Sequence, residues 1–164
     1  MGTITMPLRE VDYPNYPGLN PQAADLWRTW LRLYEPAFEN FQYNVRVGQG
    51  LDPGPGATDA LREMWRQVTT KRVDVVAHRL NESWIIEIEP RPGLRTLGQL
   101  TGYAHLGPKY ISLRPVLVLA VISTYIGFDM FGAFRSIGAL VFAFPPGKAP
   151  NLPPNFQPVV SPAG

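Results

Sequence analysis

The chain has 164 residues, of which 45% are hydrophobic and 17% charged, and its formal net charge is +2. This size fits one domain, and the apolar content excludes a disordered chain. The lack of cysteine excludes a disulfide framework and a thiolate metal site, and it favours the cytoplasm or a virus particle assembled there. The sequence pI near 9.0 permits nucleic-acid binding without arguing for it, because no basic run stands out.

No segment predicts a membrane span or a secretory signal. Residues 1–8 lack a basic start and a long apolar stretch. The most apolar segment, 115–144, opens with a run at 116–122 that is much shorter than the about 20 residues of a bilayer span. Asp129 and Arg135 interrupt the rest. We therefore expect two buried strands joined by a short helix here.

Both ends of the chain are rich in proline and flank a central domain predicted at 20–144. Residues 1–19 should form an extended arm, and residues 145–164 an extended tail without a core of its own, because proline removes backbone donors and forbids regular helix. An ordered tail of this kind lies against its own domain or against a neighbouring chain. We predict contact with another chain.

The first half of the domain predicts a helix, a strand and a loop. The helix should begin at Asn20-Pro21, because asparagine is a good N-cap and proline suits the first helical position. Pro36 should kink or end it. Alternation predicts a strand at 41–47, followed by a loop rich in glycine and proline at 48–56 and one or two helical turns at 58–66.

The second half predicts a hairpin, a helix and two more strands. The hairpin strands are 72–78 and 83–89, followed by a helix at 94–106 with Leu94, Leu97, Thr101 and Ala104 on one face. A strand at 116–122, a short helix at 128–137 and a strand at 139–144 complete the domain. This order implies an α/β fold, a mixed central sheet flanked by helices.

Three acidic residues on the hairpin are the main candidates for chemistry. Asp74 lies on its first strand, and Glu87 and Glu89 share one face of its second strand. The opposite face, with Trp84, Ile86 and Ile88, is apolar and should face the core.

The hairpin turn decides whether the acids meet. With Asn81-Glu82 as a two-residue turn, Val76 pairs with Glu87 and Asp74 with Glu89, so the three acids gather on one face. A turn one residue longer moves Asp74 to the other face. Clustered carboxylates need a balancing cation or protons, and oxygen ligands suit Mg²⁺ or Mn²⁺, which activate water for phosphodiester hydrolysis. The alternative is a solvated strand face with no chemistry.

Three segments resemble the PD-(D/E)xK nuclease superfamily: 71–76 (KRVDVV), 84–90 (WIIEIEP) and 97–103 (LGQLTGY). In that family an aspartate on one strand and an acid-x-Lys on the next bind metal, and the following helix often carries a glutamine and, four residues later, a tyrosine. The resemblance covers about 20–144 and is best at 71–106. It implies a restriction-endonuclease-like αβββαβ core and a Mg²⁺- or Mn²⁺-dependent DNA nuclease.

The resemblance also implies a role for each matching residue. Asp74, Glu87 and the carbonyl of Ile88 would hold the metal, and Gln99 and Tyr103 would support the site and the DNA backbone. Val73 stands where the motif has proline. Glu89 stands where the family usually has the lysine that positions the attacking water, although a few restriction enzymes of this fold use glutamate there. Glu89 would then bind metal or orient water, with a nearby cation standing in for the lysine; the candidates are Lys71, Arg72, Arg91 and Arg95.

A decayed site is the competing interpretation, in which the fold is kept as a scaffold. The chain would then be a structural subunit of an assembly, which would be either a homo-oligomer or a hetero-assembly. A phage head–tail connector or tail is one example of such an assembly. A small-molecule enzyme has little support, because neither a nucleotide loop nor a nucleophile–base pair is visible.

Glu39 and His78 are weaker candidates for the site. Glu39 is either an additional metal ligand or a solvated helix residue, and His78 is interpreted as a neutral surface histidine. The aromatic residues at helical spacing indicate core or interface rather than a base-stacking platform; they are Trp27, Trp30 and Tyr34.

Overall fold

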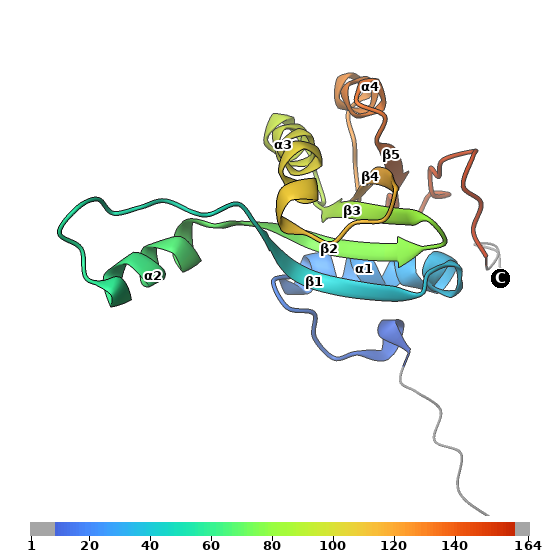
Figure 1. Cartoon of the computed structure of the whole chain (residues 1–164). Coiled ribbons are helices and arrows are strands. Elements are labelled where there is room, and N and C mark those ends of the chain that lie inside the picture. The colour runs from blue at the N-terminus through green and yellow to red at the C-terminus, as the bar shows by residue number, and fades with distance from the viewer. Residues whose placement is uncertain (1–8, 160–164) are drawn as a thin grey trace, which may run out of the picture.

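The computed structural model describes residues 9–159, so the predictions for residues 1–8 and 160–164 lie outside the described part. A five-stranded sheet in the order β1-β2-β3-β4-β5 forms the centre (Figure 1). The first three strands are antiparallel, and β3, β4 and β5 run parallel. The strands are β1 Asn40–Val47, β2 Lys71–Arg79, β3 Glu82–Ile88, β4 Val116–Ser123 and β5 Leu140–Ala143.

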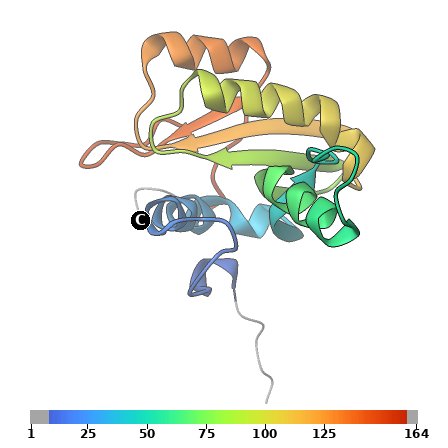
Figure 2. The same cartoon turned by 90° about the vertical axis from the view of Figure 1, so that its left-hand side faces the viewer.

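Helices cover both faces of this sheet. Helix α1 lies on one face, and α3 and α4 lie side by side on the other, as Figures 1 and 2 show. Helix α2 projects from the end of the β1–β2 pair. The bounds are α1 Pro21–Tyr34, α2 Asp59–Thr69, α3 Leu94–Tyr110 and α4 Phe128–Ser136, with short 3-10 turns at Glu10–Asp12 and Glu35–Ala37. The predicted α/β class, a mixed sheet flanked by helices, is confirmed.

Helix α1 begins and ends where the sequence signals place it. The Asn20 side chain accepts a hydrogen bond from the backbone N–H of Ala23 at 2.8 Å, and Pro21 occupies the first turn. The helix ends at Tyr34, and the 3-10 turn with Pro36 follows. Helix α2 is longer than the one or two turns predicted, because Thr58 caps it and the helix continues to Thr69.

An aromatic layer fills the space between α1 and the sheet. The Trp27 and Trp30 rings stack with centroids 4.9 Å apart, and Trp30 also packs edge-on against Phe142 of β5. Trp27, Trp30 and Tyr34 are fully buried, which confirms that they are core residues. Such large aromatic groups dominate core energetics, so this layer fixes α1 against the sheet.

Helix α3 packs through a different face from the predicted one. Its buried residues are Thr96, Leu100, Tyr103 and Gly107, whereas Leu94 is 76% exposed. Leu94 is the first helical residue and follows the extended N-cap residue Gly93, so it lies at the end of the helix and not among its buried turns. The helix also continues past 106 to Tyr110, with Pro108 inside it.

The described parts of both ends lie against the domain. Phe156 of the tail stacks on Tyr34 with ring centroids 5.2 Å apart, and the backbone N–H of Val159 bonds to the carbonyl of Leu33. In the N-terminal arm Tyr16 is buried, and the Tyr43 hydroxyl donates to Glu10 Oε2 at 2.6 Å. The tail thus has a partner within its own chain, which is one of the two alternatives open from the sequence.

The apolar segment 115–144 forms β4, α4 and β5, as expected from its length and its two interrupting charges. Between residues 9 and 159, no helix combines the length and apolarity needed to cross a membrane.

Candidate functional site

The hairpin turn is Leu80-Asn81, one residue earlier than predicted. Arg79 pairs with Glu82 across it, and their side chains form an ion pair at 2.8 Å. Glu82 therefore belongs to β3, and Leu80 adopts the positive φ of +49° that the tight turn requires. The predicted pairing of Val76 with Glu87 is wrong, because Val76 pairs with Ile85.

This shift of two residues leaves every side chain on its predicted face but changes the partners. Asp74 now lies beside Glu87 rather than Glu89, just past the last paired residues, Val75 and Ile86. The Asp74 backbone N–H donates to Glu87 Oε1 at 3.2 Å, and the Ile88 N–H donates to Asp74 Oδ2 at 2.9 Å. Each carboxylate therefore satisfies a backbone donor of the other strand where the ladder ends.

Burial makes it unfavourable for both acids of this pair to be ionised at once. Glu87 is only 5% exposed, which rules out a solvated strand face for this residue. Burial, and then the charge of Asp74, raises the pKa of Glu87 to about 9. Burial also raises the pKa of Asp74, partly offset by its hydrogen bond from Ile88. At neutral pH the pair retains a proton unless a cation replaces it.

A cavity of about 210 Å³ opens over the pair. Three parts of the chain line it: the segment before and within the first turn of α1, the acids of β2 and β3, and the first turns of α3. The lining residues are Gly18, Leu19, Asn20, Ala23, Asp74, Glu87, Ile88, Glu89, Arg95, Thr96 and Gln99. This volume is below the roughly 300–1,000 Å³ of typical organic-ligand sites, so the cavity suits an ion and phosphate oxygens better than a large organic ligand.

Glu89 lies in the same lining but is more exposed than the pair. It follows the end of β3, and its backbone N–H bonds to the carbonyl of Ile122 at 3.0 Å. Its charge adds to the rise in the pKa of Glu87 and of Asp74 as the weakest of the raising causes. Within the described residues, no three His, Cys, Asp or Glu side chains form a group that could hold a metal ion. Any metal ligand set here would consist of the Asp74–Glu87 pair and backbone oxygens.

Of the four proposed stand-in cations, Arg95 alone is among the described residues that line the cavity. The Arg91 guanidinium lies over the ring of Tyr125 instead, 5.4 Å from its centroid. Gln99 lines the cavity from the next turn of α3. Of the residues predicted for the site, Arg95 and Gln99 thus lie in the same cavity as the acids.

Tyr103 is buried in the core and is not among the residues that line this cavity. Its hydroxyl donates to the carbonyl of Arg72 at 2.9 Å. Burial, and then the charges of Glu87 and Asp74, raises its pKa to about 12. Tyr103 is therefore a neutral residue that ties α3 to β2.

Glu39 and His78 lie at the other end of the hairpin. Glu39 accepts from Arg114 Nη2 at 2.6 Å and from the Leu80 N–H, so it belongs to the turn and not to the acid cavity. His78 is buried, not on the surface, and its Nδ1 lies 2.8 Å from the hydroxyl of Ser83. Burial, and then the charge of Arg114, lowers the pKa of His78.

Sequence reasoning missed the His78–Ser83 pair, whose only signal is a serine within an apolar strand. Ser83 is fully buried, and its hydroxyl oxygen also accepts from the Arg114 backbone N–H at 2.7 Å. A substrate cannot reach this hydroxyl, so the pair fixes the loop before β4 to the hairpin. The residues of the N-terminal arm that wall the acid cavity were also missed.

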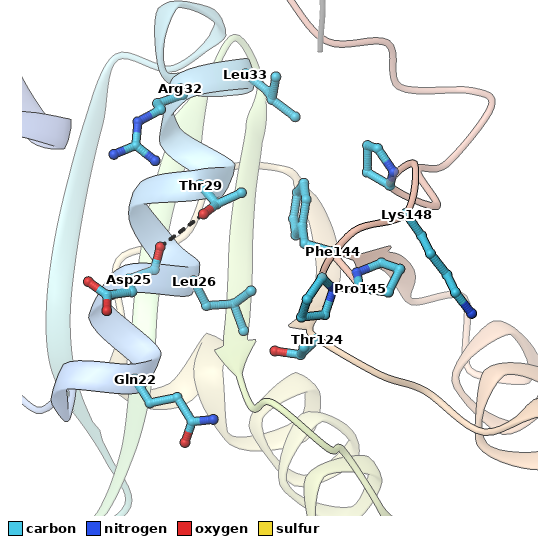
Figure 3. A pocket seen from close by; sticks show the side chains of 12 residues that line it. Gln22, Asp25, Leu26, Thr29, Arg32, Leu33, Thr124, Phe144, Pro145 and Lys148 are labelled. Atoms are coloured by element: carbon cyan, nitrogen blue, oxygen red, sulfur yellow. Dashed lines mark hydrogen bonds between the residues drawn. The ribbon is translucent and has the colours of Figure 1, made fainter. Parts of the chain in front are cut away.

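A larger groove of about 590 Å³ lies between α1 and residues 144–150 (Figure 3). Leu26 and Leu33 point toward Phe144 across it, whereas Arg32 and Lys148 lie on opposite sides. The Thr29 hydroxyl donates a hydrogen bond to the Asp25 carbonyl oxygen at 3.1 Å. These groups do not converge on one point, so the acid cavity is the better candidate for chemistry.

Comparisons with known proteins leave the family open. No family model matches the chain, and no curated protein matches it. A crystal structure of a protein of unknown function, AF1548, is similar with a TM-score of 0.45 and 17% identity over 73% of this chain and 55% of that one. The matched region thus spans about half of that protein, and a likeness at this level assigns neither a family nor an activity.

Proposed function

We propose that this chain is a metal-dependent nuclease domain of the PD-(D/E)xK type that hydrolyses phosphodiesters in DNA. The observation that carries the proposal is the pairing of Asp74 with the buried Glu87 in the lining of a small cavity, which Glu89, Arg95 and Gln99 also line. The order of elements supports it, since α1, the three antiparallel strands, α3 and β4 follow the αβββαβ order expected from the resemblance, with α2 inserted.

The donor atoms of the cavity fit a divalent cation. Asp74 and Glu87 supply carboxylate oxygens, the Ile88 carbonyl follows directly, and oxygen ligands are those that Mg²⁺ and Mn²⁺ prefer. Burial, and then the charge of Asp74, raises the pKa of Glu87, so the pair holds a proton that a bound cation would displace. When bound, such an ion would supply Lewis-acid stabilisation of the phosphodiester and activation of water.

The remaining residues would bind and orient the DNA backbone. Arg95 would donate hydrogen bonds to a phosphate oxygen, because a guanidinium matches phosphate geometry and stays charged at any working pH. Glu89, exposed beside the pair, would accept a proton from the attacking water in place of the family lysine. Helices α1 and α3 both begin at the cavity, so their N-terminal ends favour an anionic ligand there.

The test is incubation of the purified chain with linear, circular, single-stranded and branched DNA in the presence of Mn²⁺. Cleavage is expected for the wild type and should be lost in Asp74→Asn, which removes a charge while keeping the side-chain shape. The matched control is Asp129→Asn on the exposed surface of α4, which should cleave at the wild-type rate. Absence of cleavage on all four substrates, or equal cleavage by Asp74→Asn, would contradict the proposal.

A second candidate is a catalytically inactive scaffold in an assembly, such as a phage particle assembled in the cytoplasm. The observation that favours it is that each acid accepts a hydrogen bond from a backbone N–H of the other strand. In addition, Glu89 stands where the nuclease motif usually has lysine. In a scaffold the acids need only a shared proton. Asp74→Asn would then be neutral or stabilising, because it relieves repulsion between carboxylates, and Mn²⁺ would not change the melting temperature.

A further inference from the structure

A groove of about 730 Å³ lies near the hairpin turn, between β1 and the segment at the end of α3. Its walls come from β1, from His78 of β2 and from residues 110–114, and none of its lining residues lines the acid cavity. Its volume falls within the roughly 300–1,000 Å³ of typical organic-ligand sites. We call this space the His78 groove.

His78 is the buried polar residue of this groove. It is only 7% exposed, and its Nδ1 lies 2.8 Å from the Ser83 hydroxyl. Its other ring nitrogen, Nε2, has no hydrogen-bond partner among the described residues. Nε2 nevertheless reaches open space, because the one buried side-chain nitrogen or oxygen without a partner in this part of the chain is Nε1 of Trp30. The imidazole therefore turns an unused nitrogen toward the groove.

Ser83 determines which ring nitrogen of His78 carries the proton. The Ser83 oxygen accepts from the backbone N–H of Arg114 at 2.7 Å, and Ser83 is fully buried, so its own proton needs an acceptor. Nδ1 of His78 is the acceptor at hydrogen-bond distance. In the neutral imidazole the proton then resides on Nε2, so His78 offers the groove an N–H donor.

The charges around this donor favour an anionic ligand. The lining residues include Arg114 and no aspartate or glutamate. Glu39 lies nearby, but its carboxylate is paired with Arg114 at 2.6 Å. The charge of Arg114 lowers the pKa of His78 more than the charge of Glu39 raises it, so the balance of charge at the imidazole is positive.

The free donors of the groove suit a single negative charge. The Arg114 guanidinium already donates to the Leu80 carbonyl and to Glu39, so it does not offer a phosphate group its usual paired hydrogen bonds. Asn40 pairs with His78 across β1 and β2, which places an amide beside the imidazole. The groove thus presents neutral N–H donors, which fit a carboxylate better than a doubly charged phosphate.

We propose that the His78 groove binds a small organic carboxylate, with the carboxylate on the Nε2–H of His78 and an apolar body along the groove wall. That wall consists of Val45, Ile111 and Leu113, which also pack against the core. An apolar lining with a few placed polar groups is the usual composition of a small-ligand site. The proposal does not depend on the acid site, because it uses no residue of that cavity.

Nitrogen-15 NMR of the histidine side chains tests the donor and the ligand together. The chain has two histidines, and the exposed His105 is the internal reference. At about pH 7.5 the ligand-free protein should carry the His78 proton on Nε2. Hexanoate, phenylacetate and indole-3-acetate offer bodies of three shapes, and at least one should shift the His78 signals saturably without shifting those of His105. The matching primary amides should bind at least about fivefold more weakly, because a hydrogen bond to a charged acceptor is stronger.

Two substitutions test the role of the donor by saturation-transfer NMR on the ligands. His78→Asn keeps an acceptor for Ser83 where Nδ1 lies but removes the Nε2–H, so it should stay folded and lose carboxylate binding. Asn40→Asp places a negative charge beside the donor, so it should weaken carboxylate binding and leave amide binding unchanged. The controls are Asn155→Asp on the exposed tail and Asp74→Asn in the acid cavity, both of which should bind like the wild type.

Several outcomes would overturn the proposal. They are a ligand-free His78 protonated on Nδ1, no shift with any of the three carboxylates at millimolar concentration, and equal binding of phenylacetate and phenylacetamide. Tighter binding of phenyl phosphate than of phenylacetate would overturn the assignment to carboxylates. Asn40 is exposed, so Asn40→Asp should fold normally and decides the matter even where His78→Asn does not fold; unchanged carboxylate binding by this variant would contradict the site.

Discussion

Replacing Glu87 by glutamine should remove a pH dependence of stability that the buried acid pair creates. The pKa of Glu87 is raised from its ordinary value of 4.5 to about 9 in the folded protein, so the native state holds a proton that the unfolded state has lost. The stabilisation is therefore complete below the unfolded pKa and is lost as the pH rises through the folded pKa. One extra native proton gives a slope of about −1.4 kcal/mol per pH unit, or a loss of about 2 kcal/mol from about pH 7 to about pH 8.5.

Urea unfolding of the metal-free protein at both pH values measures this slope. His78 adds only a small opposing slope, because its lowered pKa leaves it neutral in the native state and only the residual protonation of the unfolded imidazole near pH 7 is lost. Glu87→Gln keeps the size and hydrogen-bonding shape of the protonated acid, so its stability should be flat with pH, whereas Asp129→Asn should retain the wild-type slope. A wild-type stability that is flat or rises with pH, or an unchanged slope in Glu87→Gln, would refute the buried shared proton.

Two further predictions concern the segments that pack against the domain. Phe156→Ala should lower the free energy of unfolding by about 2 kcal/mol in urea denaturation, since the half-buried ring stacks on Tyr34; a change close to zero would contradict docking of the tail. Gly18→Ala should lower it by about 2 kcal/mol and Gly56→Ala by about 1 kcal/mol, because both have positive φ but only the Cβ at position 18 would lie 2.8 Å from the Asn44 side chain. Equal losses would argue against a tight fit beside the cavity.

The order of helices and strands could be predicted because its signals are local. The cap at Asn20, the alternation before Val47 and the apolar runs of β4 and β5 act within a few residues of one another. The acids could be assigned to one side of the hairpin for the same reason, since a shift of two residues preserves the face. That is why Asp74 and Glu87 meet although the predicted pairing was wrong.

Features set by packing between distant segments could not be predicted. The rotation of α3 depends on how it docks on the sheet, so periodicity alone selected Leu94 and Thr101 instead of Leu100 and Tyr103. The Leu80 turn uses a positive φ at a residue that gives no turn signal. The docking of Phe156 depends on contacts more than 100 positions away in the chain, as its hydrogen bond from the Tyr34 hydroxyl illustrates.

The acid cavity depends both on local sequence signals and on packing between distant segments. The sequence predicts Asp74, Glu87 and Glu89 as its acids and names Arg95 among four cations, but it does not predict which cation reaches them. The arm residues Gly18 and Leu19 complete the wall only because residues 9–19 fold back on the domain.

Titration of Mn²⁺ into the metal-free chain at about pH 8, followed by electron paramagnetic resonance, tests the central claim most directly. We expect one bound ion per chain, released by excess Mg²⁺ and accompanied by proton release, because a cation replaces the proton of the Asp74–Glu87 pair. Binding should disappear in Asp74→Asn and persist in Asp129→Asn. A wild type that binds no Mn²⁺, or an Asp74→Asn variant that binds it equally well, would contradict a metal-dependent site in this cavity.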